Sequence, residues 1–107
     1  MGKLRHYDKH TKKIMPIRNG LGDNIIFNKV ISEIFNMYGD KEIIVGTNYP
    51  YVYKNNKRVK VMDIFESALY EDIDRFNVYR FMFCRRWHKT IFEAYKQMLI
   101  EDEANNN

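Results

Sequence analysis

Short continuous apolar runs alternate along the chain with longer stretches in which apolar residues recur at three-and-four spacing. The run at residues 14–17 predicts a brief strand, and Pro16, which has no N–H to donate, favours an edge or a strand start there. Residues 42–47 are β-branched and continuous, as expected of a strand buried on both faces. Between these runs, apolar residues recur at the spacing of a helix with one buried face. They are Ile26, Phe27, Val30, Ile31, Ile34, Phe35 and Met37. A strand, a helix and a strand predict a right-handed βαβ unit with parallel neighbouring strands.

The helix of this unit has recognisable end signals. Gly20 and Gly22 precede it, and two glycines allow a tight strand-to-helix turn in backbone conformations closed to other residues. Asp23 or Asn24 is a suitable N-cap. Gly39 has the residue type that ends helices at the C′ position.

The second half of the chain has weaker patterns. Residues 49–56 are aromatic and predict a loop or a short helix, and residues 59–62 predict a third strand. Residues 77–83 are dense in aromatics and suit either a fourth strand or the start of a helix, and we favour the strand. A clearer helix closes the chain, because Thr90 and Glu93 have the spacing of a capping box before an amphipathic stretch.

These elements predict a small Rossmann-like α/β three-layer sandwich, with a parallel sheet of three to four strands in the order 3-2-1-4 and helices on both faces. A chain of 107 residues has room for one such domain. We expect a flexible basic tail at residues 1–13, the domain at residues 14–100 and a disordered tail at residues 101–107.

Composition narrows the class of partner only a little. The chain is 45% hydrophobic and 30% charged, which suits a packed core with a solvated surface. Its net charge of +4 favours anionic partners such as sugar phosphates, nucleotides, nucleic acid or a lipid surface. The basic residues are spread along the chain, which favours an ordinary solvated surface over a polyanion-binding stripe, so nucleic acid is an unlikely partner. They include Lys12, Lys13, Arg18, Lys29, Lys54, Lys57, Arg58, Lys60, Arg85 and Arg86.

Cysteine content and hydropathy indicate a cytoplasmic location. Cys84 is the single cysteine, so it can form neither an intramolecular disulfide nor a cysteine-rich metal site. Residues 1–13 lack the apolar stretch of a secretory signal. No apolar run reaches the roughly 18 residues of a membrane helix.

The glycine turn is the most informative candidate site. A strand-to-helix turn presents unpaired backbone N–H groups and the positive end of the helix dipole at the carboxyl edge of the sheet, where anions bind. Residue 25 is Ile, so the turn does not match the dinucleotide fingerprint, and it is not a P-loop. We therefore expect no cofactor. Asp23 has two interpretations, a helix N-cap or a general base, and on its own the cap is favoured.

Three histidines and three tyrosines each have a functional and a packing interpretation. His88 lies beside two arginines and could meet a phosphate, although a surface or packing role is favoured. His6 and His10 could bind a metal if they lay on a helix, but in a polar tail we expect them to bind nothing. The alternating tyrosines suit either a stacking surface or half-buried packing. They are Tyr49, Tyr51 and Tyr53.

The stretch at residues 17–26, with its Gly-x-Gly-Asp turn, resembles the opening of ADP-heptose:lipopolysaccharide heptosyltransferases and related GT-B glycosyltransferases. The resemblance covers residues 14–64, and residues 85–95 more loosely resemble a later helix of such domains. It implies the N-terminal, acceptor-side half of the enzyme. By the same resemblance, Asp23 stands where the family has its proposed base for the acceptor hydroxyl. The implied binding residues are Gly20, Leu21, Gly22, Asn24 and Arg18.

The chain is too short for the second domain that binds the nucleotide sugar in that family. The resemblance therefore implies an acceptor-binding half of an inverting, metal-independent transferase, inactive alone, and leaves open whether this chain is itself an enzyme. Its expected partners are a sugar or sugar-phosphate acceptor and a separate donor-binding domain or chain, and a homo-oligomer is also open. The alternative is a non-catalytic basic α/β module that binds a phosphate-bearing ligand, nucleic acid or protein. A basic face built from Lys54, Lys57, Arg58 and Lys60 would favour that alternative.

Overall fold

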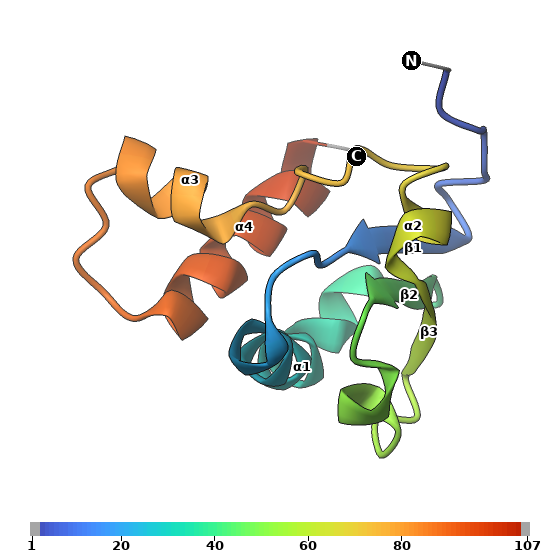
Figure 1. Cartoon of the computed structure of the whole chain (residues 1–107), viewed down its shortest axis with the longest axis horizontal. Helices are drawn as coiled ribbons and strands as arrows, with labels where there is room; N and C mark the ends of the chain where they lie inside the picture. The colour runs from blue at the N-terminus through green and yellow to red at the C-terminus, as the bar shows by residue number, and fades with distance from the viewer. Residues whose placement is uncertain (1–2, 106–107) are drawn as a thin grey trace.

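A computed structural model describes residues 3–105 and contains one parallel sheet (Figure 1). Its three strands are β1 (Lys12–Pro16), β2 (Glu42–Thr47) and β3 (Val59–Asp63), in the spatial order β1-β2-β3. Met15 pairs with Val45 and Ile43 pairs with Val59, so equivalent positions of the three strands point to the same face. The α/β class and the parallel βαβ unit are confirmed.

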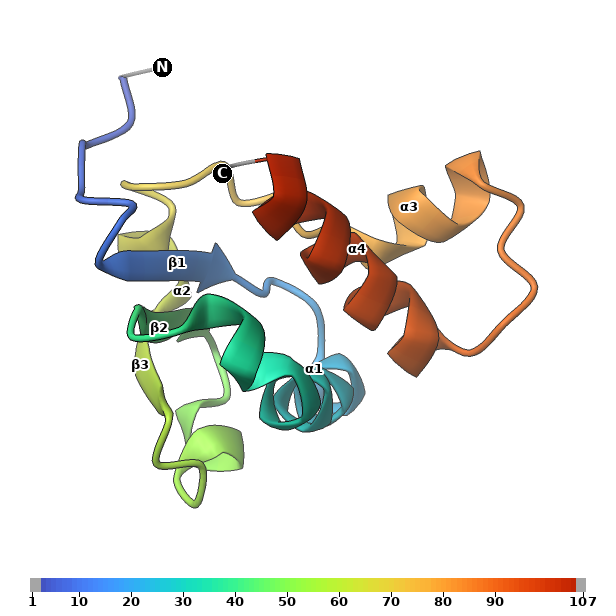
Figure 2. The same cartoon turned by 180° about the vertical axis from the view of Figure 1, so that it is seen from behind.

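Two long helices cover one face of this sheet (Figure 2). They are α1 (Leu21–Ile34), which continues into the 3₁₀ turn η1 (Phe35–Tyr38), and α4 (Ile91–Asn105). Their apolar sides and the inward residues of the strands form one core, because each element has a single apolar side that must leave water. The fully buried members include Met15, Phe27, Val30, Ile31, Ile43, Val45, Ala94, Tyr95 and Leu99.

The opposite face is covered by the short helix α2 (Ile64–Ser67) and by the segment before β1. Ile14 and Ile44 on this face are 3% and 7% exposed. Gly46 allows α2 to approach the sheet, because a Cβ at this position would lie 1.9 Å from Oγ of Ser67. A helical segment therefore lies on each face, although α2 is a single turn.

The prediction of a fourth strand at residues 77–83 is wrong. Residues 77–83 lie mostly in α3 (Val78–Cys84), and the described residues form a three-stranded sheet. The density of aromatic residues favoured a strand. Asn77 instead caps a helix, because its side-chain oxygen accepts a 3.1 Å hydrogen bond from the N–H of Arg80. The helix buries Val78 and packs against α4. Of the predicted strand order 3-2-1-4, only the three strands 3-2-1 are present in the described residues.

The observed ends of α1 differ from the predicted ones. The helix starts at Leu21 with Gly20 as N-cap and no side-chain cap, so neither Asp23 nor Asn24 is the capping residue. Gly20 has φ −72°, and Gly39 is the described glycine with a positive φ, at 56°. The turn before α1 therefore requires no glycine-only conformation. The predicted stop of the helix at Gly39 is wrong, because α1 ends at Ile34 and Gly39 follows the 3₁₀ turn η1 instead.

Both expected tails are shorter than predicted. Lys12 and Lys13 belong to β1, and the segment before it is attached to the rest of the fold, since the N–H of Arg5 donates a 2.7 Å hydrogen bond to the carbonyl of Leu69. At the other end α4 continues to Asn105, and the capping box that begins it is confirmed by a 3.2 Å bond from the N–H of Glu93 to Thr90 Oγ1. Residues 1–2 and 106–107 of the predicted tails lie outside the described residues.

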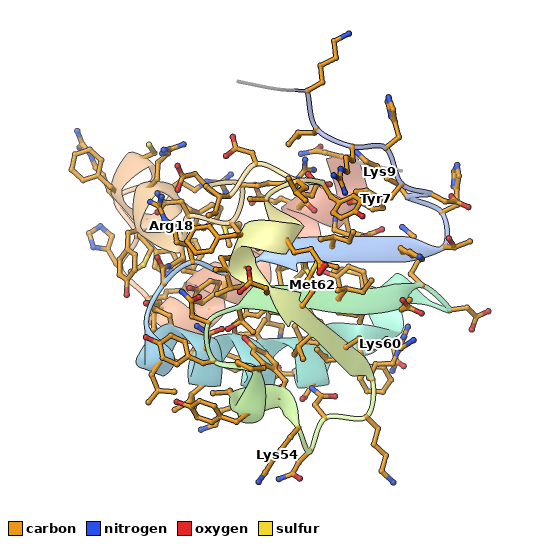
Figure 3. All side chains as sticks on the ribbon, turned by 45° about the vertical axis from the view of Figure 1, so that its right-hand side comes forward. Tyr7, Lys9, Arg18, Lys54, Lys60 and Met62 are labelled. Atoms are coloured by element: carbon orange, nitrogen blue, oxygen red, sulfur yellow. The ribbon has the colours of Figure 1, made fainter. Side chains whose placement is uncertain are left out.

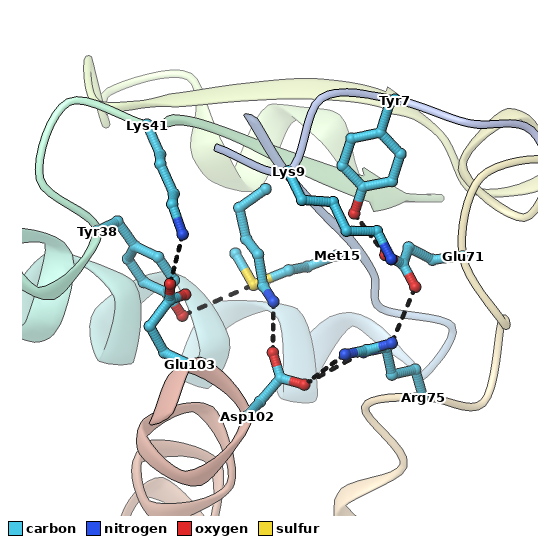
Figure 4. A network of polar contacts seen from close by, with 10 residues as sticks. Tyr7, Lys9, Met15, Tyr38, Lys41, Glu71, Arg75, Asp102 and Glu103 are labelled. Atoms are coloured by element: carbon cyan, nitrogen blue, oxygen red, sulfur yellow. Dashed lines mark hydrogen bonds and ion pairs between the residues drawn. The ribbon is translucent and has the colours of Figure 1, made fainter. Parts of the chain in front are cut away.

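The last turns of α4 are held by ion pairs rather than by apolar contacts (Figure 4). Nζ of Lys13 lies 2.5 Å from Asp102, and Nζ of Lys41 lies 2.6 Å from Glu103. Arg75 adds a 2.8 Å contact to Asp102. Burial alone would raise the pKa of Asp102, but the hydrogen bond and charge of Lys13, with those of Arg75, hold it below its usual range.

None of the helices within residues 3–105 combines the length and the apolar character that a bilayer crossing requires.

Candidate functional site

The candidate site lies where the carboxyl ends of the strands meet the first turn of α1 and the side of α3. Four residues connect β1 to α1, and the second of them, Arg18, extends into solvent at this edge (Figure 3). Its guanidinium lies 2.8 Å from Asp74, and its side chain is 55% exposed. The arginine is therefore at the predicted edge, with its charge shared with a carboxylate of the chain.

Asp23 lies in the first turn of α1 and is half-buried. Both of its carboxylate oxygens accept from the phenol of Tyr79 on α3, at 2.9 Å and 2.8 Å. The carboxylate caps no helix, and its bonds with Tyr79 link α1 to α3. The position also places a negative charge near the positive end of the helix dipole, which is an electrostatically favourable arrangement.

Tyr79 is a hydroxyl donor at neutral pH. Burial, followed by the hydrogen bond and the negative charge of Asp23, raises the pKa of its phenol above the usual range. The side chain is about half exposed. The pair shows that a phenolic hydroxyl reaches the Asp23 carboxylate at hydrogen-bond distance.

Asn24 turns away from the surface and is fully buried. Its amide nitrogen donates to the carbonyls of Asn19 and Gly20 at 3.0 Å and 2.9 Å. Its side-chain oxygen accepts from the hydroxyls of Thr47 and Tyr53 at 2.7 Å and 2.8 Å. Every hydrogen-bonding group of this side chain is thus used by the protein, so Asn24 holds the turn in shape and offers nothing to a ligand.

The same turn is tied to the last helix. The side chain of Asn19 donates a 3.2 Å hydrogen bond to the phenol of Tyr95, whose ring packs edge-on against Phe27 at 5.4 Å. Burial raises the pKa of Tyr95, so its hydroxyl stays protonated. The turn is consequently positioned by β2, the 3₁₀ turn η2 (Pro50–Tyr53) and α4 together.

The backbone at Gly20 and Gly22 is open to solvent. An added Cβ at either position would meet no heavy atom within 4 Å, so the fold itself does not require glycine there. Leu21 between them is 41% exposed. A ligand could approach this bare backbone closely, which side chains at positions 20 and 22 would prevent.

A hollow of about 460 Å³ lies at the same edge, at the carboxyl ends of β2 and β3. Thr47 connects it to the turn, because its hydroxyl binds Asn24, the neighbour of Asp23. Asp63 contributes a carboxylate, which also caps α2 by accepting from the N–H groups of Phe65 and Glu66. The hollow is lined by Thr47, Asn48, Pro50, Val61, Met62 and Asp63.

The other candidates from the sequence do not gather at this edge. His6 and His10 lie in a segment without helical structure, so the spacing that would have allowed a shared metal does not apply. His88 is exposed in the connection between α3 and α4. Tyr53 is buried with its hydroxyl on Asn24, whereas Tyr51 is 59% exposed, so the alternating tyrosines form no continuous stacking surface.

The basic face expected for the alternative function is only partly formed. Lys60 forms a 3.0 Å ion pair with Glu42, and the guanidinium of Arg58 donates to the carbonyl of Gly39. Figure 3 shows Lys54 and Lys60 extending from different parts of the molecule. Two of the four cations therefore serve contacts within the fold.

Sequence reasoning missed Tyr79, the residue that contacts the candidate base. It is 56 positions from Asp23, and residues 77–83 were assigned to a strand. The side-chain cap at Asn77 was the available signal, because a helix starting at residue 78 places Tyr79 in its first turn.

Comparison with known proteins identifies no relative of this chain. No family model, no curated protein and no solved structure matches the chain.

Proposed function

We propose that the chain is the acceptor-binding half of an inverting, nucleotide-sugar-dependent sugar transferase with a Rossmann-like fold, and that Asp23 is its general base. The observation that carries the proposal is the Asp23 carboxylate, which stands in the first turn of α1 at the carboxyl edge of the sheet. It caps no helix, and it accepts its hydrogen bonds from the hydroxyl of Tyr79. A carboxylate that already accepts from one hydroxyl is suited to bind and deprotonate another.

The reaction requires little from this half beyond positioning and a base. The acceptor hydroxyl displaces the phenol of Tyr79 from the carboxylate and transfers its proton to Asp23. Its oxygen forms a bond to the anomeric carbon, while the bond from that carbon to the phosphate oxygen of the donor breaks and the nucleoside diphosphate leaves with the electron pair. Attack from the opposite side inverts the anomeric configuration.

Acceptor binding is supported by the hollow beside the turn. Asn48 and Asp63 are suited to hydrogen-bond sugar hydroxyls, while Val61 and Met62 provide apolar contact. The open backbone of Gly20 and Gly22 adds a place for a phosphate on the acceptor.

A donor-binding partner is supported by apolar surface near the same edge. Leu21 and Ile25, one turn apart on α1, are 41% and 42% exposed. The adjacent 3₁₀ turn η2 (Pro50–Tyr53) exposes Tyr51, and it packs against α1 through a 3.3 Å bond from Asn28 to the carbonyl of Val52. Such a patch suits a contact with the domain or chain that would carry the nucleotide sugar.

Heteronuclear NMR of the labelled chain tests the proposal. We expect glucose 6-phosphate or another sugar phosphate to shift the amide signals of residues 20–25 and of Asn48, and we expect Asp23→Asn to weaken the response. Asp40→Asn removes the same charge at an exposed position between η1 and β2 and should leave the response unchanged. Shifts confined to residues 54–60, and seen only with an oligonucleotide, would refute the transferase in favour of a nucleic-acid-binding module.

The second candidate is a non-catalytic binding module, and one observation favours it. Arg80, Arg86 and Lys89 are exposed and form no ion pair within residues 3–105. This local excess of positive charge is separate from the Asp23 site and has its own consequence.

A further inference from the structure

The end of α3 and the connection to α4 form a tip at the far end of the molecule from β3 (Figures 1 and 2). We call residues 80–89 the α3 tip. Phe83 is 85% exposed, more than any other large apolar side chain that the structure describes. Single apolar residues are common on protein surfaces, so the ring gains significance only from its surroundings.

Those surroundings are positively charged. Arg80, Arg86 and Lys89 are exposed, and none of them has an acidic partner in the part of the chain that the structure describes. Arg85 is neutralised by Glu101 and lies 4.2 Å above the ring of Phe81. The α3 tip therefore presents one exposed aromatic ring and three cations without an ion pair, of which Lys89 shares a hollow with Glu33 and Glu93.

Arg86 occupies an unfavourable backbone conformation. Its φ is 50°, and its N–H bonds the carbonyl of Phe83 at 3.2 Å while the N–H of Trp87 bonds that of Met82 at 2.9 Å. This bond pattern is a Schellman motif in which Arg86 takes the C′ position that glycine normally fills. An arginine at this position costs stability and exposes a cation beside Phe83, which fits a binding role for its side chain.

We propose that the α3 tip docks on an anionic phospholipid surface, with Phe83 entering the boundary between headgroups and acyl chains. Arg80, Arg86 and Lys89 then lie at the level of the lipid phosphates, and each strengthens binding about fivefold. Phe83 contributes about tenfold or more through its buried ring. The inference is independent of the Asp23 site.

The geometry favours lipid over single-stranded nucleic acid. A nucleic-acid site stacks successive bases on several free aromatic faces. Here Phe81 packs against Trp87 at 5.4 Å, and the indole N–H of Trp87 donates to the carbonyl of Thr90 at 3.0 Å. Among the phenylalanine and tryptophan rings of the α3 tip, Phe83 is the one that is free to contact a partner. A single protruding ring among cations suits a lipid surface.

Sedimentation of the full chain with vesicles tests this docking. We expect the protein to bind vesicles of phosphatidylcholine mixed with phosphatidylglycerol, to bind vesicles of phosphatidylcholine alone far less, and to dissociate as salt is raised. Trp87 is the single tryptophan and lines the hollow beside Phe83, so its fluorescence should shift to the blue on binding.

Three variants locate the docking surface. Phe83→Ser should weaken binding about tenfold or more, and Arg86→Gly about fivefold, although the second change suits the positive φ and keeps the fold intact. Lys54→Ala removes one exposed cation elsewhere on the molecule and should bind as the parent does (Figure 3).

Three results would overturn the proposal. One is the absence of binding to phosphatidylglycerol vesicles, and another is undiminished binding by both Phe83→Ser and Arg86→Gly. The third is a labelled single-stranded oligonucleotide that binds through Phe83 and Arg86, measured by fluorescence anisotropy, while vesicles do not bind.

Discussion

The phenol of Tyr79 donates to both oxygens of the Asp23 carboxylate, at 2.9 Å and 2.8 Å, and so joins α3 to the first turn of α1. The contact lies at the surface rather than in the core, since Tyr79 is 52% exposed. Water and ligands can therefore reach the carboxylate, and the pair can open without disturbing the packed interior.

Replacement of Asp23 should weaken ligand binding while leaving the stability of the fold nearly unchanged. Asp23→Asn should change the free energy of unfolding by less than about 1 kcal/mol, because exposed hydrogen bonds contribute little. It should nevertheless weaken the NMR response to a sugar phosphate. Tyr79→Phe removes the other partner of the pair and should leave that response in place. A loss of several kcal/mol from Asp23→Asn in urea unfolding would show that the carboxylate is structural.

Two glycine substitutions should have opposite effects on stability. Gly22→Ala lies in α1 with free space around the new Cβ, so it should stabilise the fold by about 0.5–1 kcal/mol. Gly46→Ala would place a Cβ 1.9 Å from Oγ of Ser67 and should destabilise by about 2 kcal/mol or more. Thermal unfolding measures both, and Ser67→Gly should recover part of the Gly46→Ala loss. A stable Gly46→Ala variant would contradict the close approach of α2 to the sheet.

Asn24 should be the most sensitive polar residue of the turn. Asn24→Ala leaves the hydroxyls of Thr47 and Tyr53 without their acceptor and the carbonyl of Asn19 without its side-chain donor. We expect a loss of about 3 kcal/mol in urea unfolding, because several buried groups become unsatisfied at once. Asn28→Ala, at a half-buried position of the same helix, is the control and should cost about 1 kcal/mol. Equal losses at the two positions would contradict the role assigned to the buried network.

The ion pairs of Asp102 should make stability depend on acid pH. Burial raises its pKa, yet the hydrogen bond and charges of Lys13 and Arg75 lower it overall, so the native state favours the ionised form. This stability is present above about pH 4 and is lost as the pH falls through the lower native pKa.

Asp102→Asn is the matching variant. At neutral pH it should lose about 3 kcal/mol, because Lys13 stays buried beside an uncharged group. Below about pH 4 the variant and the parent should converge in stability. Glu101→Gln, which breaks the more exposed pair with Arg85, should have a much smaller effect. Unfolding midpoints measured across this pH range would contradict the prediction if the two curves stayed parallel.

The sheet and its first helix were predictable because their signals are local. Residues 42–47 form a continuous β-branched run, and the run at residues 14–17 has the same character, although β1 starts earlier. Lys12 and Lys13 extend that strand with polar residues, and Lys13 is buried because Asp102 neutralises it. A pattern of apolar residues cannot indicate a buried lysine whose partner is 89 positions away.

The candidate site was predictable only in part. The Gly-x-Gly-Asp turn indicated the edge of the sheet and Asp23, and the structure places Asp23 in the first turn of α1. The inward direction of Asn24 depends on Thr47 and Tyr53, which approach it only after folding. Residues 77–83 were misassigned because aromatic content outweighed the single capping residue Asn77.

The pairing of Lys13 and Lys41 with Asp102 and Glu103 has a consequence for synthesis on the ribosome. Both lysines emerge with the first two strands, whereas their counter-charges follow 89 and 62 positions later in the chain. Until then, closing the sheet against its helices would bury two ammonium groups without partners, which is strongly unfavourable. The nascent domain should therefore stay open until the end of α4 has left the exit tunnel.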